Sequence, residues 1–568
     1  MPRRPPPSLA LLGALLLVAA LACGAEPRRA AVGPVPASPE PDRPAPLVLP
    51  AEPAVARDAP RPLLARAKPA GAWRRAELRR LRRTRTVRGA LRRAWVAGAI
   101  DRAQHDAWRS DLWAAERAAR RLKGASAEGQ RAALRIVEGM AARRALTSGR
   151  LPLAFLQLRR NTAWWTRHGP PGRDITWGED PVTLRPVAGA GLVVHHLASW
   201  GRVNALAGRC AREPDACPKL RLRAALARMT SLGARRRGAL AWEHLFPFAG
   251  GRPGWISAMV QGTAIQALSR GGDVLGERRW VRAASRAMGA FERRPPAGVA
   301  VGRYYAMYSF DPSLRVVNGF LQTLVGLRDM ATTHRSARAR RLYLRGDREA
   351  RRMLRVSDTG AWSLYAAGGR ESTLGYHRLT GSFLRALCTR TRRGAYCAAR
   401  KRFARYEREP PRIGLRTARR PRAGATTLVR FSLSKLAKVA VEVRGPGGGV
   451  ELQRVLRVPR GTHAVAWRPA RRGAHRVRVL AQGPSGPRGV ARGSVAVQRS
   501  AAAVAAERRR RAAARRRAAA ARRRAAQRRR EEERRRRATS ADAAGAPAAR
   551  PPRGTAAPSP AAPPSPEG

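Results

Sequence analysis

The hydrophobic pattern of the chain changes its period after Pro410-Pro411, and this change constrains the fold more than any other feature. Before these prolines, apolar residues recur at spacings of three and four, which is typical of amphipathic helices. After them, Val439, Val441 and Val443 alternate with small or charged residues, which is typical of strands that bury one face. We therefore expect a mainly α chain in which a helical part precedes a β-structured part.

The helical part is expected to contain paired helices. Apolar periodicity places them near residues 255–270, 276–292, 317–331, 336–355 and 376–390. The segment Gly271-Gly272-Asp273 is expected to separate the first two. Residues 73–149 contain no proline and predict two or three further amphipathic helices, with breaks at Gly98 and near Gly124.

The β-structured part is expected to contain about six short strands between Thr426 and Gln498. Turn signals at Gly447-Gly448-Gly449 and Pro459-Arg460-Gly461 divide it. This pattern favours an immunoglobulin-like sandwich at residues 425–498. Because no catalytic constellation occurs there, we interpret it as an accessory or spacer module.

The N-terminus predicts export. Arg3 and Arg4 precede an apolar run, and small residues surround Cys23, so residues 1–25 are interpreted as a signal peptide or lipoprotein signal. A lipoprotein reading makes Cys23 the lipidation site and the only expected contact with a membrane, whereas cleavage alone gives a secreted protein. Residues 26–72, rich in Pro, Ala and Arg, predict a disordered linker.

The charge of the chain predicts attraction to polyanions. With 115 Lys and Arg against 37 Asp and Glu, the formal charge is +78. In residues 499–568, an Ala/Arg segment predicts a solvated, partly helical arm that binds anionic cell-surface polymers, before a disordered tail. The export signal and the lack of a recognised nucleic-acid motif argue against specific nucleic-acid binding.

The cysteines after Cys23 form two local pairs, Cys210 with Cys217 and Cys388 with Cys397. In an oxidising compartment, two disulfides are the natural pairing. Neither spacing is the short C-x2-C or C-x4-C of a zinc site, so we expect no metal, and nothing in the sequence indicates a cofactor.

Aromatic side chains gather at a few places before Pro410. Of eight tyrosines, Tyr304, Tyr305 and Tyr308 fall within five positions, and Asp311-Pro312 then interrupts the chain before a helical pattern. These tyrosines are either functional groups on a loop or short strand, or core aromatics with hydroxyls satisfied at the surface. The pair Trp164-Trp165 is suited to stacking on sugar rings or to a core or rim position.

Several motifs occur in a characteristic order around the tyrosines. Trp255-Ile-Ser-Ala-Met-Val-Gln-Gly262 comes first, then Tyr304 to Phe320, an Asp358-Thr-Gly segment ending in Tyr365, and the pair Tyr376-His377. Together they resemble the C-terminal catalytic domain of the D-glucuronyl C5-epimerase family. The resemblance implies an (α/α) barrel-like catalytic domain, placed at 150–410, that acts on an acidic polysaccharide.

The resemblance implies catalytic roles for Tyr308, Tyr365 and Tyr376. Inversion at C5 removes a proton from one face of the uronate ring and delivers one to the other, so two acid/base groups must flank the ring. Motif positions and neighbouring arginines give the candidate substrate-binding residues: Arg303, Arg315, Arg378, His377, Trp255, Gln261 and Asn318.

The chain departs from the family beside Tyr308. The family has acids at the two preceding positions, where this chain has Ala306-Met307, and a His where Thr380 stands. Asp311 or Glu371 are candidate replacements. Three hypotheses remain: an exported uronyl C5-epimerase-like enzyme, with a lyase as a variant; a catalytically weak or inactive surface-tethered glycan-binding relative; and a nucleic-acid-binding protein, which the export signal disfavours.

Overall fold

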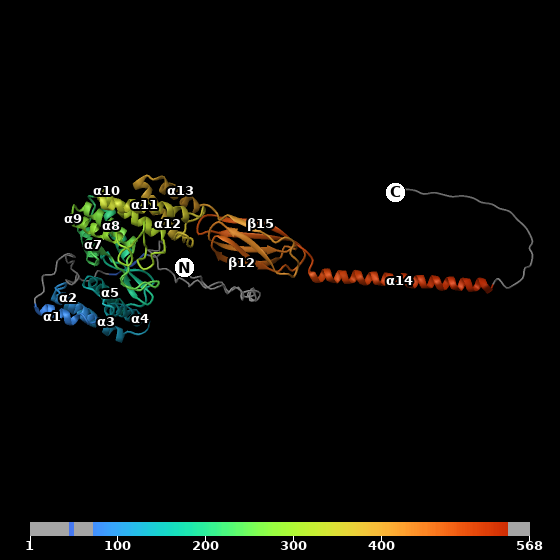
Figure 1. Ribbon diagram of the computed structural model, residues 1–568, viewed down its shortest axis with the longest axis horizontal. Coiled ribbons are helices and arrows are strands. Elements are labelled where there is room, and N and C mark those ends of the chain that lie inside the picture. The colour runs from blue at the N-terminus through green and yellow to red at the C-terminus, as the bar shows by residue number, and fades with distance from the viewer. Residues whose placement is uncertain (1–44, 50–71, 543–568) are drawn as a thin grey trace, which may run out of the picture.

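The computed structural model describes residues 45–49 and 72–542 (Figure 1). The predicted signal, Cys23 and the tail after residue 542 lie outside the described residues, as does nearly all of the predicted linker. Within the described ranges, the chain passes from helical layers to a β-rich region and then to one long helix. None of the described helices is both long enough and apolar enough to cross a membrane.

Four helices occupy residues 72–142, where the sequence predicted two or three. They are α1 (Ala72–Leu81), α2 (Val87–Val96), α3 (Arg102–Arg121) and α4 (Gly124–Ala142). The expected breaks occur where predicted, because Gly98 and Gly124 have φ angles of 68° and 56°, which favour glycine. Helix α1 was missed because it buries only Leu81 and has no apolar stripe.

A small sheet follows, which the sequence did not predict. After η2 (Ser148–Arg150) and α5 (Leu151–Trp165), the sheet contains β2 (Ile175–Trp177), β3 (Leu184–Val187) and β4 (Gly191–Val194). Strand β1 (Leu47–Leu49) adds to β2 in parallel, which gives the order β1-β2-β3-β4. Strands of three or four residues are too short to show a period of two.

Paired helices form the centre of the molecule. Helices α6, α8, α10 and α12 pack side by side in this order, so that α8 and α10 each lie between two others. Each is followed by a partner, and the pairs are α6 (His196–Arg212) with α7 (Lys219–Ser231), α8 (Ala258–Val274) with α9 (Arg278–Ala287), α10 (Val317–Thr333) with α11 (Ala337–Ser357), and α12 (Leu374–Thr391) with α13 (Gly394–Tyr406). The predicted helices between 255 and 390 are thus present.

Short elements connect these helices. The ribbon β5 (Ala234–Arg236) and β6 (Ala239–Ala241) precedes α8, and η3 (Met288–Phe291) extends α9. The ribbon β7 (Ala300–Val301) and β8 (Tyr304–Tyr305) precedes α10 and carries the first two tyrosines.

The expected break between helices at Gly271-Gly272 is absent, so that prediction was wrong. Helix α8 runs through both glycines and ends at Val274. A Cβ at Gly271 would lie 2.5 Å from Leu226, and one at Gly272 would lie 2.8 Å from Val281. The glycines therefore allow α7 and α9 to approach closely, and the chain turns later, at Gly276, where φ is 65°.

The β-rich region contains two antiparallel sheets around a common core. The six predicted strands are present, and β9, which lies before the predicted start at 425, joins them. The sheet orders are β13-β10-β9 and β12-β11-β14-β15. The strands are β9 (Ile413–Arg416), β10 (Thr427–Leu433), β11 (Ala437–Arg444), β12 (Val450–Val458), β13 (Gly461–Trp467), β14 (Gly473–Gln482) and β15 (Arg488–Val497).

The basic arm is a continuous helix rather than the partly helical segment expected. Helix α14 (Ala501–Asp542) has 42 residues and points away from the β-rich region (Figure 1). Alanine and arginine both favour helix, and Glu507 pairs with Arg511 at 2.8 Å and with Arg499. These contributions outweigh the like-charge repulsion on which the expectation rested.

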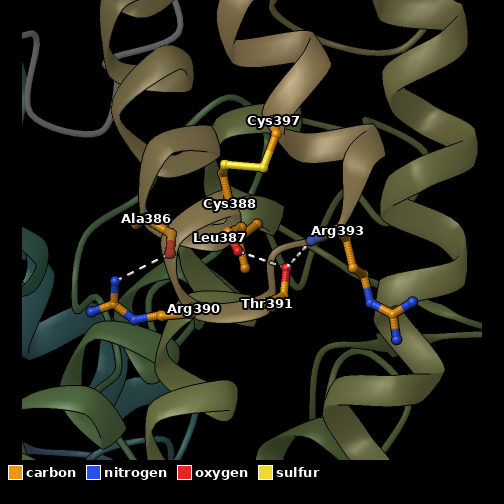
Figure 2. Close-up of a disulfide and its surroundings, with 7 residues drawn as sticks. All are labelled: Ala386, Leu387, Cys388, Arg390, Thr391, Arg393 and Cys397. Atoms are coloured by element: carbon orange, nitrogen blue, oxygen red, sulfur yellow. Dashed lines mark hydrogen bonds between the residues drawn. A yellow bond between two sulfur atoms is a disulfide. The ribbon is translucent and has the colours of Figure 1, made fainter.

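Both predicted disulfides are present. Cys388–Cys397 joins the last turn of α12 to α13 (Figure 2). Between them, Arg392 adopts a left-handed φ of 51°, and the Thr391 hydroxyl donates to the Leu387 carbonyl at 2.7 Å. The bridge therefore fixes a tight helix–helix turn that lacks the usual glycine.

Candidate active site

Three tyrosines from separate segments meet in the helical part of the molecule. Tyr308 lies in the loop after β8, Tyr365 in the loop between α11 and α12, and Tyr376 in the first turn of α12. The rings of Tyr365 and Tyr376 are 5.0 Å apart, and both tyrosines are electrostatic neighbours of Tyr308. We call these three residues the tyrosine cluster; all are at most 6% exposed.

Two hydroxyls of the cluster are buried without a satisfied hydrogen bond. Those of Tyr308 and Tyr365 are close enough to affect each other's pKa, but neither forms a hydrogen bond of good geometry with a described residue. Burial raises the pKa of both phenols, that of Tyr308 well above its usual value. Both are therefore neutral proton donors near pH 7.

The preceding tyrosines behave differently. The Tyr304 hydroxyl donates to the Leu314 carbonyl at 3.2 Å and accepts from the Val316 amide at 2.9 Å. The Tyr305 hydroxyl donates to the Leu342 carbonyl at 2.8 Å. Both are core aromatics, but backbone groups inside the protein, rather than the surface, satisfy their hydroxyls.

Four helices begin around the tyrosine cluster. The N-cap residues of α6 and α8, His195 and Ser257, line the same cavity as Tyr308. The first amide of α10 donates to the Tyr365 carbonyl at 3.1 Å, and α12 contributes Tyr376. Because helix N-termini carry partial positive charge, this end of the four helices favours an anion such as a carboxylate.

The cavity beside Tyr308 is small and contains no carboxylate in its lining. His244, Trp255 and Met307 line it, and Trp255 stacks on His244 with ring centroids 3.9 Å apart. Arg185 also lines it but is paired with Asp174 at 2.7 Å. Its volume of about 30 Å³ accommodates about one water molecule, so a sugar ring requires side chains to move.

His244 is the residue of this site to which sequence reasoning gave no role. Burial holds its pKa well below the usual value, so the imidazole is neutral, and its Nδ1 has no hydrogen-bond partner among the described residues. The Nδ1 atom of His195, by contrast, accepts from the Ala198 amide at 3.1 Å. The available signal was its place in Trp242-Glu243-His244, just before the motif at Trp255.

Met307 occupies the position at which the family resemblance implies a glutamate. Its sulfur lies 3.5 Å from the Ser257 hydroxyl, and a Cβ at Gly319 would lie 2.6 Å from it. The thioether therefore lies between the starts of α8 and α10, beside the cluster, where a carboxylate would face two helix N-termini.

The two acids considered as replacements are engaged elsewhere. The Asp311 carboxylate accepts from the Ser313 hydroxyl at 2.6 Å within its own turn. Glu371 accepts from the amides of Leu436 and Arg460 at 2.9 and 2.7 Å, which ties the helical part to the β-rich region. Neither acid lines the cavity beside Tyr308.

Four of the candidate substrate-binding residues do not line the cavity beside Tyr308. Arg303 is exposed, Arg315 pairs with Glu349, and Arg378 pairs with Glu407 at 2.8 Å. His377 is enclosed, with its ring 3.7 Å from that of Trp362 and its nitrogens near the Ser363 hydroxyl and the Phe403 carbonyl, at 2.8 and 2.9 Å.

Three further candidates lie closer to the helix starts. Trp255 lines the cavity. The side-chain amide of Gln261 donates to the Trp242 carbonyl at 3.2 Å. Asn318, second in α10, is 1% exposed, and neither amide atom is hydrogen-bonded to a described residue. No three His, Cys, Asp or Glu side chains in the described ranges are placed to hold a metal.

Known proteins are similar over the part of the chain that holds this site. Residues 239–405 match the family model described as D-glucuronyl C5-epimerase C-terminus. A D-glucuronyl C5-epimerase from Caenorhabditis elegans is 29% identical in an alignment of 130 residues that covers 20% of this chain. The match spans about a fifth of that relative's length, 21%. Residues 239–405 are therefore similar to the D-glucuronyl C5-epimerase family, as the ordered motifs predicted.

Proposed function

We propose that the protein is a uronyl C5-epimerase-like enzyme that inverts C5 of glucuronate units in an acidic polysaccharide. The observation that carries this proposal is the convergence of Tyr308, Tyr365 and Tyr376 at the N-terminal ends of four helices, with two hydroxyls left unsatisfied. A buried polar group without a partner costs about 1–3 kcal/mol, so its retention calls for a functional reason.

The proposed reaction is proton removal and return at C5. The neutral His244 imidazole takes the C5 proton, and the C–H electron pair moves into the adjacent carboxylate, where the helix N-termini stabilise the added charge. The Tyr308 phenol then donates its proton to the opposite face of C5. Solvent returns a proton from His244 to Tyr308. Trp255 must shift to admit the ring, and the low pKa of His244 makes turnover slow.

A catalytically weak or inactive glycan-binding relative is the second candidate. The specific observation in its favour is the lining of the cavity, which has Met307 where the family has a glutamate and contains no carboxylate. Such a protein would retain the substrate surface while lacking a strong base.

The domain architecture, the export of the protein and the role of the basic arm are part of the same proposal. The paired helices of residues 150–410 support an (α/α) barrel-like domain, and the two sheets support an immunoglobulin-like module at 425–498. The two disulfides are typical of extracellular proteins and, with the predicted N-terminal signal, support export, either secreted or lipid-anchored through Cys23. The exposed arginines of α14 suit anionic cell-surface polymers.

Hydrogen exchange tests the proposed reaction. The full chain is incubated with a glucuronate-containing polysaccharide in deuterated water, and deuterium at C5 is measured by NMR. Incorporation supports epimerisation even if equilibrium disfavours the product. An unsaturated, ultraviolet-absorbing uronate indicates a lyase instead. Binding without exchange across a panel of uronate polymers supports the inactive glycan-binding relative.

A further inference from the structure

We propose that helix α4, outside the family match, provides a basic groove that binds further uronate units of the polymer on one side of the tyrosine cluster. The groove is lined by Arg131, Arg135 and Arg143 of α4 and its C-cap, by Arg252, and by the turn at Gly189. This inference rests on the proposed function, because it assigns the acidic polymer to a second surface of the same site.

The groove consists of two adjacent hollows, and each borders the cavity beside Tyr308. Their volumes are about 490 and 670 Å³, within the range of ligand sites, and both linings include Arg135 and Gly189. The first shares Val187 with the cavity beside Tyr308, and the second shares Phe248 with it. A polymer in the groove would therefore pass next to the cluster.

The arginines of the groove are available for a ligand except Arg131, whose Nε donates to the Ala119 carbonyl at 3.2 Å. Arg131, Arg135 and Arg143 are separated by four and eight residues, so they extend about 18 Å along α4 and about a third of the way round it. Arg135, Arg143 and Arg252 are exposed and form no side-chain hydrogen bond or ion pair with any described residue. Each guanidinium can bind a carboxylate through two N–H groups.

The rest of the lining suits a sugar chain. Gly189 and Gly250 have positive φ angles of 73° and 86°, and no side chain covers their backbone. Trp165 and Pro170-Pro171 supply apolar surface against which a pyranose can pack. Glu128 is the one acid in the lining of the two hollows, and it lies at the end far from Arg143.

A second basic hollow shows that charge alone does not define this groove. It lies between α6 and α7 and includes Arg209 and Arg221, but Arg221 pairs with Glu179 at 2.8 Å. Its lining shares no residue with the lining of the cavity beside Tyr308. It therefore offers a control surface of the same charge type on the same chain.

The test compares two double variants of the full chain that lose the same charge. Arg135→Gln/Arg143→Gln alters the groove, and Arg209→Gln/Arg212→Gln alters the exposed end of α6, where Arg209 lines the control hollow. Both retain α14, so its non-specific binding cancels in the comparison. Dissociation constants are measured by calorimetry at physiological salt for glucuronate oligosaccharides from two to about ten units, a span chosen to exceed the roughly 18 Å row of arginines.

We expect wild-type affinity to rise with oligosaccharide length and the groove variant to lose about tenfold or more for the long oligosaccharides only, because one charged hydrogen bond has about this value. The control variant should stay within about twofold of wild type. Equal losses in both variants, or wild-type affinity that does not rise with length, would overturn the groove. Because binding is measured without turnover, length-dependent binding without C5 exchange would reject epimerisation and retain the groove.

Discussion

Two groups of buried tyrosines in the helical part of the molecule differ in what their hydroxyls do. In one, Tyr343 and Tyr396 both donate to Oδ1 of Asp347, at 2.9 and 2.8 Å, and Arg351 binds Oδ2 at 3.2 Å. In the tyrosine cluster, the hydroxyls of Tyr308 and Tyr365 have no satisfied hydrogen bond with described residues.

This difference separates a structural arrangement from a chemical one. Burial raises the pKa of the phenols in both groups, so pKa alone does not distinguish them. A phenol that already donates to a carboxylate stabilises the fold and has no proton to give. A neutral phenol without an acceptor keeps its proton for a ligand.

The largest effect is expected for Tyr308→Phe. The ring is kept and only the proton donor is lost, so C5 exchange should fall by about 10²–10⁴-fold. Stability to urea should be unchanged or slightly higher, because an unsatisfied hydroxyl is removed. Tyr376→Phe should also lower exchange. An equal loss of exchange in Tyr396→Phe would remove the distinction between the two groups.

Acid should destabilise the protein through the histidines beside the cavity. Burial lowers the pKa of His196 to about 4, and its Nδ1 has no partner in the described structure to accept a second proton. The unfolded chain binds this proton near pH 6.5, so the stability from the neutral ring is complete above pH 6.5 and is lost as the pH falls to 4, by about 3 kcal/mol.

Urea unfolding of wild type and His196→Gln at pH 7, 5.5 and 4.5 measures this contribution. The variant should depend less on pH than wild type over this interval. Identical pH dependence in the two proteins would show that other groups cause the acid sensitivity.

Met307→Glu should raise C5 exchange by about 10²-fold, the lower end of the effect of one acid/base group. The carboxylate would lie between the starts of α8 and α10, whose partial positive charge favours its ionised form. Met307→Gln, which has similar size and no base, serves as the control. If both variants leave a measurable wild-type exchange unchanged, His244 or another group already provides the base.

Tyr396→Phe should lower the free energy of unfolding by about 1.5–3 kcal/mol, because a buried carboxylate loses a hydrogen bond. Binding of a uronate oligosaccharide should not change. Urea unfolding at pH 7 measures the free energy of unfolding, and calorimetry measures the binding of the oligosaccharide. A stability loss for Tyr308→Phe as large as that for Tyr396→Phe would contradict the proposed contrast.

The smallest effect on stability is expected when residues 499–568 are removed. Helix α14 has no buried residue among those whose exposure is described, so the thermal midpoint should change little. Binding to acidic polymers should weaken and become less dependent on salt. A large drop in the thermal midpoint would instead show that the arm packs against the rest of the chain.

Local patterns predicted the elements well where they are long and one-sided. The helices at 317–331, 336–355 and 376–390 correspond to α10, α11 and α12, because each buries a regular apolar stripe. The predictions failed where the apolar pattern is weak, or where glycines serve a purpose other than ending a helix. Helix α1 is mostly exposed, strands β2 to β4 are very short, and Gly271-Gly272 serve close packing rather than a break.

The sequence by itself determined the order of helical and β-structured parts, the two disulfide pairs and the tyrosines worth testing, because these depend on local periodicity, short loops and ordered motifs. Only the tertiary structure decided which hydroxyls are left without partners, that Glu371 joins the β-rich region, that His377 is enclosed, and that α4 borders the site. These features depend on contacts between residues far apart in the chain. Such contacts are fixed by how the helices pack, and no local pattern in the sequence records them.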